Sequence, residues 1–187
     1  MVWWIGGSSK IEQAIAQIAR NSDRAIDIIA AAVLEEHITN AIKKRWRDSP
    51  KVADGLLQIE GPLGNFGPKI DLVFLMGLIS PEGHQDMKII KKIRNKFAHN
   101  LEVDTFETPL IKGWCFELSH FEKFVLKDEE MRGPNPAGKI FGVAGMNEKL
   151  QQPKGRYLVA VQLYSMLFGA DWSGIYMPPV TLPTPIY

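Results

Sequence analysis

Apolar side chains recur at helical spacing along most of this chain of 187 residues. The clearest run follows Ser22, a residue type that favours a helix N-cap, and Asp23 and Asp27 place negative charge near the positive end of the helix dipole. No stretch alternates convincingly with a period of two, so the pattern predicts an all-α, single-domain helical bundle of about six to eight helices with no significant sheet. The predicted buried face of the first clear helix consists of Ile26, Ile29, Ala30, Val33, Leu34, Ile38, Ala41 and Ile42. Further helical runs cover about 10–20, 69–79, 85–98, 108–125 and 154–168.

The composition bounds the domain organisation. With 45% hydrophobic and 23% charged residues, the chain is typical of a globular domain rather than of a disordered segment. Residues 8–172 are expected to form one all-helical domain, because a chain of this length suits a single core. Four prolines between residues 178 and 187 predict that the segment 173–187 is an extended or disordered tail.

Several features indicate the compartment. The longest apolar stretches, 70–79 and 157–168, fall short of the ~20 residues that a membrane span requires. The first residues lack the charged region that opens a signal peptide. Cys115 is the only cysteine, which excludes an internal disulfide and favours a reducing environment. The sequence therefore predicts a cytoplasmic protein with no membrane among its partners.

The charge balance disfavours a general nucleic-acid-binding domain. Lysine and arginine number 22 against 21 aspartates and glutamates, which leaves little net attraction for a phosphate backbone. No helix-turn-helix pair or zinc-finger spacing is recognisable. The basic cluster at 43–47 and the lysine face of the 85–98 helix are more typical of solvated helix surfaces. We therefore expect no specific DNA operator among the partners.

Two short patterns suggest ligand sites but lack the required context. Residues 133–140 follow the spacing of a phosphate-binding loop, but Ile140 stands where that loop needs a serine or threonine. Glu117 and His120 form one Glu-x-x-His step, and a di-iron bundle needs two. Cys115 lies between Trp114 and Phe116, which is typical of an inert core thiol. No cofactor and no metal site is expected.

Two motifs in the middle third carry the strongest functional signal. One is a loop motif that consists of Gly61, Pro62, Leu63, Gly64 and Asn65. The other is the step Arg94-Asn95-x₃-His99, which begins thirty residues after Gly64. Together they resemble the mannitol operon repressor family over about 22–106, in which a Gly-Pro-Leu-Gly loop precedes a helix and an Arg-x₄-His step follows on the next one.

The resemblance implies an all-helical fold and a regulatory role in sugar-alcohol uptake. It also implies action through another transcription factor, because the family looks poorly equipped to bind an operator itself. The leading prediction is a non-enzymatic regulator that binds a protein partner as a homodimer.

The loop motif also carries a structural expectation. Gly61 and Gly64 are expected to adopt backbone angles or close approaches that a side chain would block. Leu63 and Phe66 could then pack against the core.

The Arg-x₄-His step supports an alternative function. It also resembles the Arg-x₄₋₆-His signature of the HEPN superfamily, whose active members are metal-independent endoribonucleases with a site between two helical protomers. As candidate catalytic residues, His99 would transfer a proton at a ribose 2′-hydroxyl, Arg94 would hold the phosphate and Asn95 would orient either. The structural interpretation is that Arg94 pairs with a carboxylate while His99 and Asn100 cap the helix. RNA binding or cleavage therefore stays open as the alternative.

Overall fold

The computed structural model describes residues 22–119 and 150–169, and that part of the chain contains six helices and no strand. The predicted all-α fold is confirmed. The helix expected at about 10–20 lies outside the described residues. The same is true of His120, the 133–140 pattern and the tail 173–187. The helices are α2 (Asp23–Lys43), α3 (Pro50–Leu57), α4 (Phe66–Leu75), α5 (Pro81–His99), α6 (Pro109–Glu117) and α10 (Pro153–Gly169).

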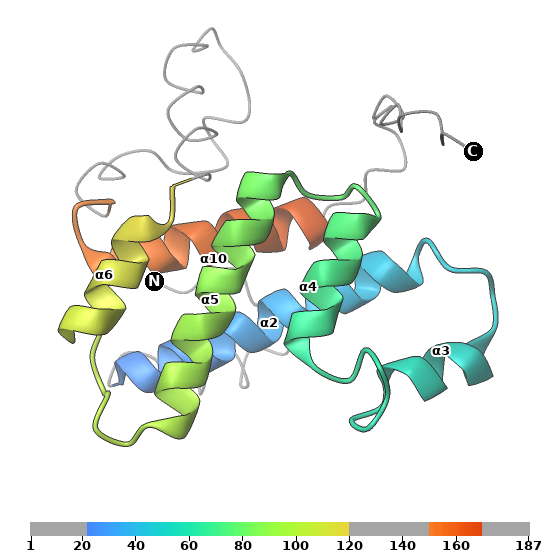
Figure 1. The fold of residues 1–187 in the computed structure, drawn as a ribbon, viewed down its shortest axis with the longest axis horizontal. Coiled ribbons are helices and arrows are strands. Elements are labelled where there is room, and N and C mark those ends of the chain that lie inside the picture. The colour runs from blue at the N-terminus through green and yellow to red at the C-terminus, as the bar shows by residue number, and fades with distance from the viewer. Residues whose placement is uncertain (1–21, 120–149, 170–187) are drawn as a thin grey trace, which may run out of the picture.

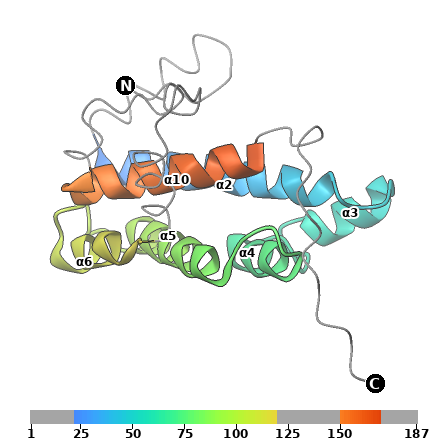
Figure 2. The same cartoon turned by 90° about the horizontal axis from the view of Figure 1, so that it is seen from above.

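The helices form two layers (Figures 1 and 2). The long helices α2 and α10 lie side by side in one layer, and α4, α5 and α6 form the other. The core fills the space between these layers, with Leu34, Ile90 and Tyr157 fully buried from three different helices. Phe106 links the layers, because its ring packs 5.1 Å from Phe97 and 5.2 Å from Tyr157. No helix of the described residues is long and apolar enough to cross a membrane.

Helix starts follow from capping chemistry. The Ser22 hydroxyl accepts a hydrogen bond from the amide of Ala25 at 3.2 Å, as its position before the apolar run predicts. Ser80 caps α5 in the same way, accepting from the amide of Gly83 at 3.1 Å. The sequence placed the start of α5 near residue 85, and this is wrong by about one turn. Pro81 occupies the first helical position, where its missing N–H costs nothing.

Two arginines hold helix ends in the second layer. Arg156 of α10 is buried and donates to the carbonyls of Cys115, Leu118 and Leu150. The bonds to Cys115 and Leu118 satisfy carbonyl groups that the end of α6 would otherwise leave without partners. Arg24 of α2 likewise donates hydrogen bonds to carbonyl groups at the end of α5 and just after it. The helix α5 carries the Arg-x₄-His step.

Candidate functional site

Arg94 and His99 lie on different sides of α5. Five residues along an α-helix correspond to a rotation of about 140° between the two side chains. Arg94 is half-buried on the side that faces α2, whereas His99 is exposed. The Arg94 guanidinium donates to Oδ1 of Asn95 at 3.0 Å. The structure thus brings together Arg94 and Asn95, and it leaves His99 on the outer face.

A buried carboxyl group on α2 lies within the electrostatic influence of Arg94. Asp27 has no exposed surface, and among the described residues neither of its carboxyl oxygens has a hydrogen-bond partner. Burial raises the pKa of Asp27 to about 7, because the charged form loses its hydration. The nearby hydroxyl of Tyr157 and the positive charge of Arg94 both limit this rise. Sequence analysis assigned Asp27 to the helix dipole; the structure places it instead at a junction of α2, α5 and α10.

The same junction includes Tyr157 and Cys115. Burial raises the pKa of the Tyr157 hydroxyl well above its usual value, and the Asp27 charge adds to the effect. Burial likewise raises the pKa of Cys115 to about 12, and the Asp27 charge contributes. A thiol with such a pKa is protonated at neutral pH and is a poor nucleophile.

Arg24 fixes the segment around His99. It donates to the carbonyls of Asn100 and Leu101 at 3.1 Å each, to that of Val103 at 2.6 Å and to that of Phe97. Asn100 is the C-cap of α5, and its amide donates to the carbonyl of Lys96. The position of His99 is therefore set from α2 by a cation at the negative end of α5.

The outer face of α5 carries a row of polar and basic side chains. Lys92 lies over the ring of Trp114 on α6, 4.1 Å from its centroid. Lys88 pairs with Asp71 of α4 at 3.4 Å, and His84 bonds the same carboxylate at 2.7 Å. The hydrogen bond from His84, with help from Lys88, lowers the pKa of Asp71. Asn95 and His99 continue this row, one helical turn apart.

The Gly-Pro-Leu-Gly loop packs against the backbone at the end of α3. A Cβ atom on Gly61 would lie 2.5 Å from the carbonyl oxygen of Leu56, and one on Gly64 would lie 2.3 Å from that of Gln58. Neither glycine has a positive φ, so close approach rather than backbone conformation excludes a side chain. Phe66 is buried at the start of α4, whereas Leu63 is half-buried.

Comparison with known proteins assigns the family. The sequence profile described as "Mannitol repressor" matches residues 11–161, which is most of the chain. The chain belongs to the mannitol repressor family. Among solved structures, the fold is similar to one described as the X-ray structure of the MtlR–HPr complex from Escherichia coli, with a TM-score of 0.58 and 17% sequence identity. The match covers 85% of this chain and 98% of the other. Comparison with curated proteins finds no significant match.

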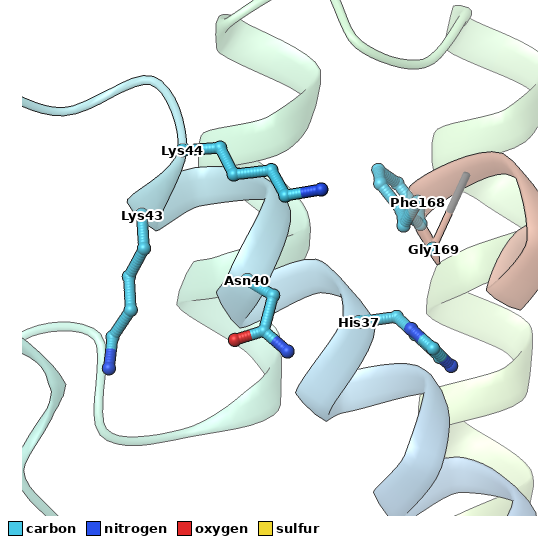
Figure 3. A pocket seen from close by; sticks show the side chains of 6 residues that line it. All are labelled: His37, Asn40, Lys43, Lys44, Phe168 and Gly169. Carbon is cyan, nitrogen blue, oxygen red and sulfur yellow. The ribbon is translucent and has the colours of Figure 1, made fainter. Parts of the chain in front are cut away.

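This member of the mannitol repressor family has a shallow pocket where α2 and α10 end (Figure 3). It encloses about 410 Å³ and is lined by His37, Asn40, Lys43, Lys44, Phe168 and Gly169. Lys44 extends toward Phe168, whereas Lys43 points away from it. A Cβ atom on Gly169 would lie 2.9 Å from Nδ1 of His37, so glycine lets the end of α10 approach α2. Within residues 22–119 and 150–169, no group of three or more His, Cys, Asp or Glu side chains could hold a metal ion.

Sequence analysis missed α3. This helix begins at Pro50, with Ser49 as its N-cap residue, and buries none of its residues. Val52 is 60% exposed, and Ile59, just beyond the helix, is 87% exposed. The signal that could have found it is Ser49-Pro50, since serine before proline is a common helix start.

Proposed function

We propose that this member of the mannitol repressor family is a non-enzymatic regulator that acts on transcription through a protein partner, rather than by binding an operator directly. Family membership supports the regulatory role. The similar Escherichia coli protein was crystallised with HPr, which supports a protein as the partner. The near balance of 22 basic and 21 acidic residues leaves little general attraction for DNA.

The observation that carries the non-enzymatic part is the set of partners around Arg94. Its guanidinium is bonded to Asn95 and lies in the field of the buried Asp27 carboxyl. A phosphate-holding arginine needs its planar donors free at the surface. Asn95 instead occupies part of the Arg94 guanidinium, which favours the structural interpretation of the Arg-x₄-His step.

The proposal includes a cytoplasmic homodimer. The buried, unpaired Cys115 suits a reducing compartment. Sedimentation equilibrium of the purified chain measures the oligomeric state directly, and a monomer at micromolar concentration would remove the dimer from the proposal.

Calorimetric titration with HPr from the same host tests the partner class, because HPr is the protein found with the similar structure. The proposal predicts saturable binding. If HPr gives no heat, affinity purification from the host identifies whether another protein co-purifies in stoichiometric amount. Recovery of RNA in place of any protein would contradict the proposal.

A second candidate is an RNA-binding or RNA-cleaving protein of HEPN type. The observation in its favour is the outer face of α5, where Asn95 and the exposed His99 lie in a row with Lys92. Two such faces in a dimer would place basic groups and a titratable imidazole together.

A further inference from the structure

The pocket shown in Figure 3 lies where two parallel helices end. The helices α2 and α10 run in the same direction, from the ion pair between Asp23 and Lys154 to the close approach of His37 and Gly169. Their C-terminal ends therefore meet at one edge of the layer. The pocket between them encloses about 410 Å³, which is within the range of about 300–1,000 Å³ for small-molecule sites.

Side chains with nitrogen groups gather on the α2 side of this pocket. Lys44 extends toward Phe168, which lies on the α10 side (Figure 3). Asn40 lies one helical turn from Lys44 and one from His37, so the three side chains share one face of α2 and its end. Lys43 also lines the pocket but points away from Phe168.

The charge of the pocket is positive. Among the described residues that line it, none is acidic. The two glutamates of α2 do not line it, and one of them, Glu35, pairs with Lys69 of α4 at 2.8 Å. Neither Lys43 nor Lys44 forms an ion pair with another described residue. The charge of these lysines is therefore not neutralised by a protein carboxylate in the described part of the chain.

The end of α2 does not need these lysines to satisfy its carbonyl groups. Lysines in the last turn of a helix often serve that purpose. Here the carbonyls of residues 40–43 already accept hydrogen bonds of 3.0–3.2 Å from the backbone amides of residues 44–46 and from the Arg45 guanidinium. The ammonium group of Lys44 is therefore available to a ligand in the pocket.

Phe168 gives the pocket an apolar wall. Its ring is only 6% exposed, because most of it packs in the core, so the wall is held firmly in place. Gly169 continues this wall without a side chain, which lets the backbone of α10 lie against the imidazole of His37. A ligand in the pocket would contact nitrogen groups on one side and an aromatic ring on the other.

We propose that this pocket binds a small organic oxyanion, a phosphate monoester or a carboxylate, with its charge on Lys44 and its carbon skeleton against Phe168. Lysine binds such groups as a compact charge with three donors, and the side-chain amide of Asn40 can donate a further hydrogen bond. The site does not depend on the function proposed above, because it belongs to the isolated chain and needs no protein partner.

Titration of the purified full chain with four small probes tests the site. The probes are phenyl phosphate, benzoate, inorganic phosphate and the neutral benzyl alcohol, followed by amide shifts in two-dimensional NMR at low salt. We expect phenyl phosphate and benzoate to bind with Kd values on the order of 1 mM, as suits ligands of about ten non-hydrogen atoms. The shifts should concentrate at residues 37–44 and 168–169. Inorganic phosphate should bind more weakly, because it has no ring to place against Phe168, and benzyl alcohol should not bind.

A matched pair of variants separates the pocket from general electrostatic attraction. Lys44→Gln should raise the Kd for phenyl phosphate about tenfold or more, because it removes the charge that faces the ligand. Lys51→Gln makes the same change at an exposed lysine of α3 that does not line the pocket, and it should leave Kd within about twofold. Both positions are exposed, so circular dichroism should show the same fold for both variants.

The contrary results are distinct. If neither organic anion binds saturably, or if their shifts spread over the other helices, the site is wrong. Equal weakening by Lys44→Gln and Lys51→Gln would show that a diffuse positive field attracts the anions. Equal binding of benzyl alcohol would overturn the anion specificity, and equal binding of inorganic phosphate would remove Phe168 from the site. None of these results bears on the proposed function, which the titration with HPr tests separately.

Discussion

Arg94 on α5 lies close enough to the buried carboxyl of Asp27 on α2 for its positive charge to lower the pKa of that carboxyl, against the larger effect of burial. The two residues are 67 positions apart in the sequence, and the packing of the two layers brings them together. This relationship joins the Arg-x₄-His step to the core, and the burial of Asp27 makes the stability of the fold depend on pH.

Stability should fall as pH rises from about 4 to about 7. The pKa of Asp27 is raised from 3.8 to about 7 in the folded protein, so the folded state binds more protons than the unfolded state in this range. A shift of this size corresponds to a loss of up to about 4 kcal/mol of unfolding free energy. The loss is complete above pH 7. Thermal denaturation at pH 5 and pH 8, compared between the wild type and Asp27→Asn, isolates this contribution from that of other groups. Equal pH dependence in both proteins would refute the contribution of Asp27.

Arg94 should limit the pKa of Asp27. Arg94→Gln removes the neighbouring positive charge, so the pKa of Asp27 should rise further above its usual value and the decline in stability should extend to higher pH. Arg94→Lys retains the charge and serves as the control. Carbon-13 NMR of the Asp27 carboxyl during a pH titration reports the change. An unaltered titration in Arg94→Gln would show that the charge does not act on Asp27.

Gly64→Val should destabilise the fold. A Cβ atom at this position would lie 2.3 Å from the Gln58 carbonyl oxygen and 2.4 Å from that of Ile59, so the loop must move. We expect the melting temperature to fall by several degrees, corresponding to about 1–3 kcal/mol. Gly55→Val on α3 is the matched control, because a Cβ atom there meets nothing within 4 Å. Similar melting curves for both variants would indicate that the loop places no steric demand on residue 64.

The bond of Arg94 to Asn95 and the separation of Arg94 from His99 around α5 predict no metal-independent ribonuclease activity. Single-stranded RNA incubated with the purified protein and EDTA should remain intact. If HEPN-type chemistry operates, products would carry 2′,3′-cyclic phosphates, and His99→Ala would lower the rate about 10²–10⁴-fold. Arg94→Lys would also inactivate the enzyme, because lysine lacks the two-pronged grip on phosphate. Reproducible cleavage that both variants lose would replace the structural interpretation of the step.

The helices with a buried face were predictable because burial imposes a period on the sequence. Ser22 and the apolar residues after it locate α2, and the helical run expected at 154–168 corresponds to α10, which Pro153 and Gly169 bound. The helix α3 was not predicted, although Val52 and Leu56 recur at helical spacing, because eight residues are too few for such a period to stand out. Pro81 was taken as a boundary between helices, although it is the first residue of α5.

The candidate site was predictable only in part. Sequence analysis considered that Arg94 could pair with a carboxylate, whereas the hydrogen bond of Arg94 goes to Asn95. It could not identify the influence of Arg94 on Asp27, because that depends on how α5 packs on α2. Sequence analysis expected that a side chain would not fit at Gly61 or Gly64, but it could not show which atoms these glycines approach. The carbonyl groups that exclude a side chain belong to α3 and its end, which were themselves not predicted.

The central claim is that this regulator reaches DNA through another protein. Gel-shift titration of the promoter of its own operon with the purified chain alone, at ~150 mM salt, tests this most directly, because nonspecific attraction is weak there. We predict no specific complex, and any weak shift should disappear when competitor DNA is added. Nanomolar binding that survives competitor DNA would show that the chain is a direct repressor and would contradict the account.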